Sequence, residues 1–251
     1  MAMLVFRLSE NLFISPGYKN NLRMQTVVVL TGAGVSAESG IKTFRDSDGL
    51  WEEHRIEDVA TYDAWLRNRD LVLEFYNQRR RQLAKVEPNA AHYSLAKLEK
   101  KYNVHIITQN VDNLHERAGS KNILHLHGEL TKARSTLDET LIYDIGFNDI
   151  KEGDKCAKGS QLRPHIVWFG EAVPNIMLAA TLAKKADILL IIGTSLLVYP
   201  AAGLIDYAPT SVPKYYIDPK AANSSHYKNL TVIKEKAGTG VPALVEKMLQ
   251  E

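Results

Sequence analysis

The sequence is almost without cysteine, because Cys156 is the only one among 251 residues. A single thiol excludes an intramolecular disulfide and any metal site built from four cysteines. It also favours a reducing compartment, so we predict a cytoplasmic protein. Long apolar runs are missing too, and none reaches the roughly 18 residues that a membrane-spanning helix needs. We therefore expect no membrane partner.

An excess of charge of either sign is also missing. Lysine and arginine number 31 against 29 acidic residues, which gives a formal net charge of +2. No global field draws such a chain toward nucleic acid, and we expect no specific nucleic-acid partner. The length suits one large domain, or one domain with a small insert. The oligomeric state stays open.

Short apolar runs alternate with stretches that are typical of helices. The runs predict strands at 26–30, 104–108, 122–125, 187–192, 214–217 and 231–233, with helices at 69–86, 88–101 and 241–249. This alternation predicts an α/β fold, a Rossmann-like parallel sheet with helices on both faces. Ligands of such sheets bind beyond the carboxyl ends of the strands.

Residues 129–164 interrupt the alternation, since they carry several charges and little periodicity. The segment is too long for an ordinary loop. We expect it to be a small subdomain inserted into a Rossmann-like domain of residues 25–128 and 165–251, after an N-terminal extension of residues 1–24. Its own apolar residues would hold it together, and these are Leu137, Leu141, Ile142, Tyr143, Ile145 and Phe147.

A glycine-rich turn follows the first predicted strand. Gly32, Gly34 and Ala37 match the pattern G-x-G-x-x-G/A of dinucleotide-binding turns. Glycine lets the backbone approach a pyrophosphate closely, and a helix N-terminus then faces the negative charge. No acidic residue follows the second strand at the spacing of ordinary dehydrogenases. A plain strand-to-helix turn remains an alternative.

Five segments, in this order, resemble the signature motifs of the sirtuin family. They are GAGVSAESGIKTFR at 32–45, TQNVD at 108–112, LHG at 126–128, VWFGE at 167–171 and GTS at 193–195. The resemblance covers nearly everything after the first two dozen residues, and it is strongest toward bacterial and desuccinylase-type members. It implies an NAD-dependent enzyme that removes acyl groups from protein lysines and releases nicotinamide and O-acyl-ADP-ribose.

The chain departs from the sirtuin pattern at two places. Lys42 and Thr43 stand where the family has Pro-Asp, in the loop that closes over the nicotinamide ribose. The zinc site of four cysteines that most sirtuins carry in the small domain cannot be built here. His125, His127, His165 and Cys156 could supply ligands on paper, but no pair has finger-like spacing. We expect no metal.

The resemblance implies that His127 is the catalytic base beside the ribose. An imidazole suits this role because its pKa lies near the working pH. His125 is the nearest rival, and we expect it to pack or form hydrogen bonds outside the pocket. The residues that the resemblance places on NAD are Gly32, Ala33, Gly34, Ser36, Ile41, Phe44, Arg45, Gln109, Asn110, Asp112, Gly193, Thr194, Ser195, Asp218 and Ala237.

The resemblance also implies two segments that pair with an extended, acylated peptide. One comprises Val167, Trp168, Phe169, Gly170 and Glu171, and the other comprises Leu197, Val198 and Tyr199. Pairing of this kind binds peptide backbone, so the sequence preference is weak. The alternative for the two aromatic residues is a place in the core, which applies more to Trp168.

A tyrosine and an arginine in helix 69–86 predict the type of acyl group. Tyr76 and Arg79 are neighbours at i and i+3, on one stripe with Val72 and Leu83. A guanidinium with a phenol can clamp a carboxylate. The pair resembles the mark of sirtuins that remove succinyl and malonyl groups, so we expect these groups to be removed as well as acetyl. An interfacial salt bridge of Arg79 is the alternative.

Other functions fit the same motifs less well. NAD hydrolysis or mono-ADP-ribosyl transfer could use the same scaffold, and a sensor that binds NAD without turnover is conceivable with an altered 42–43 loop. A hydride-transferring dehydrogenase fits the glycine-rich turn, but it does not account for Asn110, Asp112 and His127 in that order. We therefore predict a deacylase.

Overall fold

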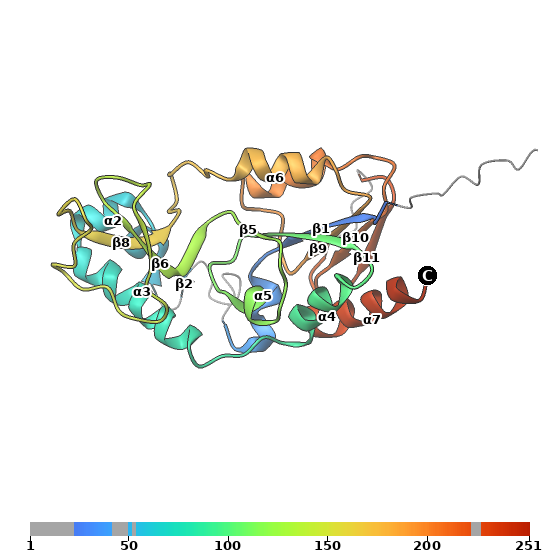
Figure 1. The fold of residues 1–251 in the computed structure, drawn as a ribbon, viewed down its shortest axis with the longest axis horizontal. Helices are drawn as coiled ribbons and strands as arrows, with labels where there is room; N and C mark the ends of the chain where they lie inside the picture. Colours follow the sequence, from blue (N-terminus) through green and yellow to red (C-terminus); the bar gives the residue numbers. More distant parts are fainter. Residues whose placement is uncertain (1–22, 42–49, 52–53, 222–226) are drawn as a thin grey trace, which may run out of the picture.

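A computed structural model describes residues 23–41, 50–51, 54–221 and 227–251. They form two units that lie side by side (Figure 1), a larger one around a parallel sheet and a smaller one that contains α2, α3, β6 and β8. Residues 1–22 of the expected N-terminal extension, and the predicted NAD contacts Phe44 and Arg45, lie outside the described residues. So do Lys42 and Thr43.

Strands and helices of the two units succeed one another along the chain. They are β1 (Thr26–Thr31), η1 (Ala33–Val35), η2 (Ala37–Ser39), β2 (Leu50–Trp51), β3 (His54–Arg55), α1 (Ile56–Val59), α2 (Tyr62–Arg67), α3 (Arg69–Leu83), α4 (Ala90–Leu98), β4 (Asn103–Thr108), α5 (Leu114–Arg117), β5 (Ile123–His125), β6 (Gly128–Ser135), β7 (Ile142–Asp144), β8 (Leu162–Ile166), α6 (Ile176–Ala183), β9 (Ile188–Ile192), η3 (Ala201–Tyr207), β10 (Lys214–Ile217), β11 (Leu230–Ile233) and α7 (Ala237–Gln250).

The large sheet has six strands in the order β11-β10-β9-β1-β4-β5, and every neighbouring pair is parallel. The chain builds β1, β4 and β5 outward in one direction, and then builds β9, β10 and β11 in the other. This is the strand order of a Rossmann fold, and its topological switch lies between β1 and β9. The expected fold class is confirmed, and all six predicted strands are present.

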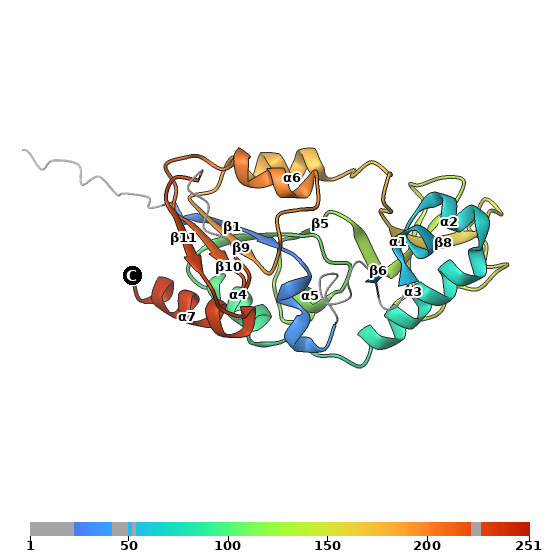
Figure 2. The same ribbon diagram turned by 180° about the vertical axis from the view of Figure 1, so that it is seen from behind.

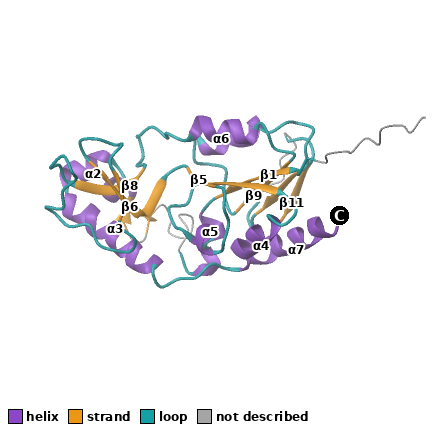
Figure 3. Ribbon diagram, viewed as in Figure 1, coloured by secondary structure: helices purple, strands orange, loops and turns teal. Residues whose placement is uncertain are grey.

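Helices cover both faces of this sheet, as Figure 3 shows edge-on. Alternation along β1 explains why. Val27 and Val29 point into a cluster with α4 and α7, while Val28 and Leu30 point into a second cluster with α6 and η3. A strand that is buried on both sides must be apolar throughout, which accounts for the unbroken run TVVVLT.

The C-terminal helix starts earlier than its sequence suggests. We expected 241–249, but α7 begins at Ala237 and contains Pro242. Gly238 and Gly240 are poor helix formers, which hid the first turn. Tertiary packing accounts for a glycine in this turn. The helix lies so close to β10 that a Cβ on Gly240 would be 2.7 Å from Ile217 Cγ2. Among the described residues, no helix is both long and apolar enough to cross a bilayer.

The smaller unit combines the antiparallel sheet β7-β6-β8 with α1, α2 and α3. Figure 2 shows these three helices gathered on one side of β6 and β8. Their shared hydrophobic cluster includes Trp65, Phe75, Leu130, Ile166 and Trp168. We propose that the small domain consists of both segments, α1–α3 and β6–β8, rather than of residues 129–164 alone.

The expected core of the inserted segment was wrong in part. Leu137, Ile142 and Phe147 are exposed, at 70%, 46% and 41% of their surface. Of the expected six, Ile145 packs against the cluster from its edge. The buried apolar residues of this segment are instead Leu130, Ala133, Ile150 and Cys156. The reason is that helices α1–α3, which precede this segment in the chain, supply the partner surface.

Polar contacts from α3 also hold this segment. The Arg80 side chain is fully buried, and it donates from Nε to the Leu130 carbonyl at 2.7 Å and from Nη1 to Asn77 Oδ1 at 2.7 Å. Asn77 in turn pairs with both backbone groups of Ile150, each at 2.9 Å. Burial lowers the pKa of Arg80 to about 10, so the group stays charged at neutral pH.

Helix α4 offers a test of the core that carries the sheet. Leu95 is fully buried between α4, α7 and the sheet, whereas Tyr93 on the same helix is 51% exposed. Leu95→Ala should lower the free energy of unfolding by about 3 kcal/mol, because it leaves a cavity. Tyr93→Ala should stay within about 0.5 kcal/mol. Urea unfolding of both variants measures the difference, and equal losses would contradict the packing described.

Candidate functional site

The turns after β1 and β9 touch each other through their backbones at the topological switch. Gly32 N–H donates to the Ile192 carbonyl at 3.0 Å, and Gly34 N–H donates to the Gly193 carbonyl at 2.8 Å. A Cβ on Gly34 would lie 2.7 Å from Gly193 Cα. Gly193 has φ +61°, and a Cβ there would meet Val35 N at 2.3 Å. No larger residue fits at these positions, so the two turns pack backbone against backbone at the carboxyl ends of the strands.

A buried hydroxyl links this turn to the segment after β4. Ser36 Oγ donates to Asp112 Oδ2 at 2.9 Å and accepts from Asn110 Nδ2 at 3.1 Å. Asp112 Oδ1 accepts the Leu114 N–H at 3.1 Å. Burial raises the pKa of the Asp112 carboxyl, and the hydrogen bonds from Leu114 and Ser36 counteract part of that rise. The three predicted residues Ser36, Asn110 and Asp112 are therefore brought together.

Two histidines that the sequence analysis did not single out lie behind Ser36. Asn89 N–H donates to His92 Nδ1 at 3.2 Å, so Nε2 carries the proton that faces Ser36 Oγ at 3.5 Å. The His115 ring stands edge-on to His92 with centroids 4.8 Å apart. Its Nε2 lies 3.2 Å from Thr31 Oγ1. In the sequence, His92 could have been noticed only through the capping pattern Asn89-x-x-His92. That pattern predicts the start of a helix and does not indicate a functional site.

His127 lies in the bend between β5 and β6, and one side of its ring is fixed. Its Nδ1 donates to the Gln109 carbonyl at 3.0 Å. Gln109 is fixed in turn, by N–H to the Thr31 carbonyl at 3.0 Å and by Nε2 to Thr194 Oγ1 at 3.2 Å. Burial lowers the pKa of His127. The ring is therefore neutral at pH 7, with the Nε2 lone pair turned away from Gln109 and able to accept a proton.

The remaining predicted cofactor residues line the same sheet edge or lie further along it. Ala33, Ile41 and Ser195 are half-buried beside the two turns, and Thr194 is buried. Asp218 follows β10 directly, and its Oδ1 accepts the Lys220 N–H at 2.8 Å, while Ala237 opens α7. Glu38, which was not predicted, accepts the Gly238 N–H at 2.6 Å and so connects the first turn to α7.

The two predicted peptide-binding segments differ in how they are held. Val167 N–H donates to the His127 carbonyl at 2.9 Å, and Phe169 N–H donates to the Ala60 carbonyl at 3.0 Å. Phe169 is 49% exposed, while Trp168 is 2% exposed and belongs to the core, as the alternative foresaw. In the second segment, Leu197 and Tyr199 are 78% and 75% exposed, and Val198 is 36% exposed.

Glu171 closes the turn that carries Phe169 and Gly170. Its carboxylate accepts from Arg163 at 2.7 and 3.1 Å, from Arg134 at 3.2 and 3.4 Å, and from the Trp168 N–H at 2.8 Å. Burial opposes its charge, but the two guanidinium groups and the Trp168 N–H lower its pKa overall. Gly170 has φ +86°, in the region that favours glycine. The Glu171 side chain thus fixes the segment from inside.

Three comparisons with known proteins bear on this arrangement. The family model described as Sir2 family matches residues 32–200. The chain belongs to the Sir2 family. A Helicobacter pylori protein named NAD-dependent protein deacylase is 56% identical over 227 residues, which are 90% of this chain and 99% of that protein. The expected sirtuin family is thereby confirmed, and with it the expected dependence on NAD.

Solved Sir2 structures agree with the fold. A Sir2 homologue in complex with NAD is 38% identical with a TM-score of 0.81, and the match covers 90% of each chain. A second structure, of a Sir2 protein with a p53 peptide and NAD, is 27% identical with a TM-score of 0.74. That match covers 91% of this chain and 95% of the other.

Tyr76 and Arg79, the residues predicted to select the acyl group, both lie on α3. Tyr76 is fully buried, and its hydroxyl accepts from Trp168 Nε1 at 3.0 Å. Burial is the main reason that its pKa is raised. Arg79 is half-buried, with its guanidinium carbon 4.9 Å from the centroid of the Phe75 ring. The fully buried arginine of this helix is Arg80, which lies one residue further along and faces β6.

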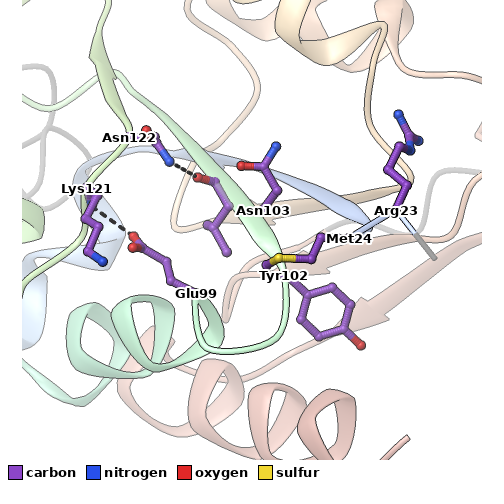
Figure 4. A pocket seen from close by; sticks show the side chains of 8 residues that line it. Arg23, Met24, Glu99, Tyr102, Asn103, Lys121 and Asn122 are labelled. Atoms are coloured by element: carbon purple, nitrogen blue, oxygen red, sulfur yellow. Dashed lines mark hydrogen bonds between the residues drawn. The ribbon is translucent and has the colours of Figure 1, made fainter. Parts of the chain in front are cut away.

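A separate pocket of about 430 Å³ opens at the amino ends of the strands (Figure 4). Arg23 and Met24 before β1, Tyr102 and Asn103 at the start of β4, and Asn122 before β5 line it. In Figure 4, the Lys121 backbone N–H donates a hydrogen bond to Glu99 Oε1, and Asn122 Nδ2 donates one to the Val104 carbonyl. This pocket is at the edge of the sheet opposite the Sir2 motifs, so it is no part of the candidate site.

The buried histidines behind Ser36 predict a specific acid sensitivity. Burial lowers the pKa of His92 to about 4, below its ordinary 6.5. The neutral form therefore contributes stability that is fully present above pH 6.5 and is lost as the pH falls toward 4. In urea unfolding between pH 6.5 and 4.5, His92→Gln should lose less stability than the parent, by up to roughly 3 kcal/mol. Parallel pH curves for the two proteins would contradict this.

Proposed function

We propose that this NAD-dependent protein deacylase of the Sir2 family uses His127 as its catalytic base. One observation carries the proposal. The proton of His127 is held on Nδ1 by the Gln109 carbonyl at 3.0 Å, which leaves Nε2 as an acceptor in a half-buried setting. A neutral imidazole with one nitrogen oriented and the other accepting is the arrangement that general-base catalysis requires.

The residues around the two turns fit NAD. Backbone at Gly32, Gly34 and Gly193 would receive the pyrophosphate, because glycine has no side chain to keep a ligand away from the chain. Asn110, Asp112 and Gln109 would hold the nicotinamide ribose and carboxamide from the neighbouring strand end. Bound NAD would supply the ribosyl carbon that takes up the acyl oxygen when nicotinamide is released. Ser36 fixes Asn110 and Asp112 relative to the glycine turn.

We propose acylated lysines of extended peptides as the substrates. Two segments could pair with such a peptide, 167–171 next to His127 and 197–199 after the β9 turn. Val167 is bonded directly to the carbonyl of His127, so a peptide on this segment would lie beside the proposed base. Exposed Phe169, Leu197 and Tyr199 offer apolar surface to the lysine stem and its acyl chain. Location in the cytoplasm stays a prediction.

We further propose that succinyl and malonyl groups are accepted through Arg79 and Tyr76. Tyr76 contacts Trp168 of the proposed peptide segment, which brings α3 against that segment. Arg79 lies one helical turn from Tyr76 and carries the charge that an acidic acyl group would need. Acetyl groups would need no such charge.

The protonation of His127 predicts the acid limb of activity. Burial lowers its pKa below 6.5, and the base must be neutral, so the acid limb of kcat/KM should lie below pH 6.5. A pH profile of NAD-dependent deacetylation measures the midpoint. His127→Ala should lower the rate by roughly 10²- to 10⁴-fold and remove the limb. A midpoint above 6.5, or full activity in the variant, would refute His127 as the base.

Acyl selectivity predicts different responses of two neighbouring arginines. Arg79→Met should lower kcat/KM for a succinyl-lysine peptide roughly 10- to 100-fold, because a hydrogen-bonded charge pair is lost, and should spare the acetyl peptide. The matched control is Arg81→Met, since Arg81 pairs with Glu74 and Asp149 on the surface. Mass spectrometry of paired peptides gives both rates. Unchanged desuccinylation in Arg79→Met would refute the clamp.

A further inference from the structure

Two histidines near the end of β5 bind consecutive backbone carbonyls of the segment after β4. His127 Nδ1 donates to the Gln109 carbonyl at 3.0 Å, and His125 Nδ1 donates to the Asn110 carbonyl at 3.0 Å. The two peptide groups that carry these carbonyls are adjacent. A shift of one carbonyl therefore moves the other, and the orientation of His127 depends on both bonds.

The second nitrogen of His125 is bound as well. Its Nε2 lies 2.7 Å from Glu116 Oε1 on α5, while the His125 side chain is only 8% exposed. The backbone of His125 is fixed independently, because Asn175 Nδ2 donates to its carbonyl at 2.9 Å. Both ring nitrogens thus face oxygen atoms that accept hydrogen bonds. A neutral imidazole carries one proton and can satisfy only one of the two acceptors, whereas an imidazolium satisfies both.

Charged and titratable groups on three sides surround this ring. They are Glu116 and His115 on α5, Asp112 before α5, and Glu129 at the start of β6. Burial lowers the pKa of His125, but the hydrogen bond and charge of Glu116, with Glu129 behind it, raise it overall. Lys132 pairs with Glu129 at 2.7 Å.

We propose that His125, held by Glu116, is a positioning residue for the reaction: it fixes the Asn110 carbonyl and, through the adjoining peptide, the Gln109 carbonyl that orients His127. The same bond steadies Asn110, whose amide reaches Ser36 at 3.1 Å. The inference rests on the proposed role of His127. The side-chain hydrogen bond of Glu116 goes to His125, and Glu116 therefore acts through that ring.

Substitutions at Glu116 separate positioning from folding, because this side chain is 38% exposed and tolerates change. Glu116→Ala removes the acceptor, and kcat for deacetylation should fall about 10-fold while KM for NAD and for the peptide stays within about 2-fold. Glu116→Gln should restore kcat to within about 3-fold, since an amide can accept from or donate to the imidazole. His105→Ala, a histidine of β4 remote from the site, is the matched control.

The pH profile gives a readout that mere packing would not move. In the parent protein, kcat should decline as the pH rises through the raised pKa of His125, because the neutral ring must release one acceptor. In Glu116→Gln this alkaline decline should disappear, since the amide donates to the neutral ring. The same alkaline limb in both proteins, or full kcat in Glu116→Ala, would overturn the proposal.

A chelator tests whether the His125 ring is held by a hydrogen bond to Glu116 or by a bound metal ion. The ligand atoms of Glu116, His125 and Glu129 lie within 4.8 Å of one another, which is close enough to hold a divalent metal. EDTA should leave the activity of the parent unchanged. A 10-fold loss in EDTA that zinc restores would show that a cation orients the ring, and would overturn the positioning by Glu116. If His127→Ala loses activity but Glu116→Ala keeps full kcat, the proposed function stands and only the positioning role of His125 and Glu116 is refuted.

Discussion

The backbone contact between the turns after β1 and β9 is the constraint on which the rest of the site depends. Gly34 and Gly193 approach each other so closely that neither tolerates a Cβ. The contact brings the two halves of the sheet together at their topological switch, where the carboxyl ends of the strands diverge. Thr194 then reaches Gln109, and Gln109 orients His127. A chain of short contacts therefore leads from one glycine pair to the proposed base.

Buried polar groups around the crevice are satisfied mainly by one another. Ser36 accepts from Asn110 and donates to Asp112, and the protonated side of His92 faces the same oxygen. An unpaired polar atom at such depth costs free energy, so each member holds its neighbours in one arrangement. Burial then sets the protonation states, with neutral His92 and His127 and a raised pKa for Asp112.

The smaller unit shows how a segment without the family's usual cysteines is held. Helices α1–α3 bury an apolar face against β6 and β8, and Arg80 satisfies the Leu130 carbonyl inside that interface. Glu171 binds Arg163 and Arg134, and the Arg163 guanidinium carbon lies 3.3 Å from the centroid of the Trp168 ring. These contacts fix the turn that presents Phe169. The proposed peptide segment is therefore anchored from the core of the small unit.

Local patterns in the sequence determined the six parallel strands and the glycine turn, and the resemblance of five motifs to the Sir2 family led to the proposal of His127. Strand runs and glycine turns depend on residues close together in the chain, so their physics is readable without the fold. Only the tertiary structure decided which distant side chains meet. It placed His92 and His115 behind Ser36, joined His125 to Glu116, and packed α1–α3 against β6 and β8. Helical periodicity marked Arg79 as the arginine on the apolar stripe. The fully buried arginine is instead Arg80, whose Nε donates to the Leu130 carbonyl of β6.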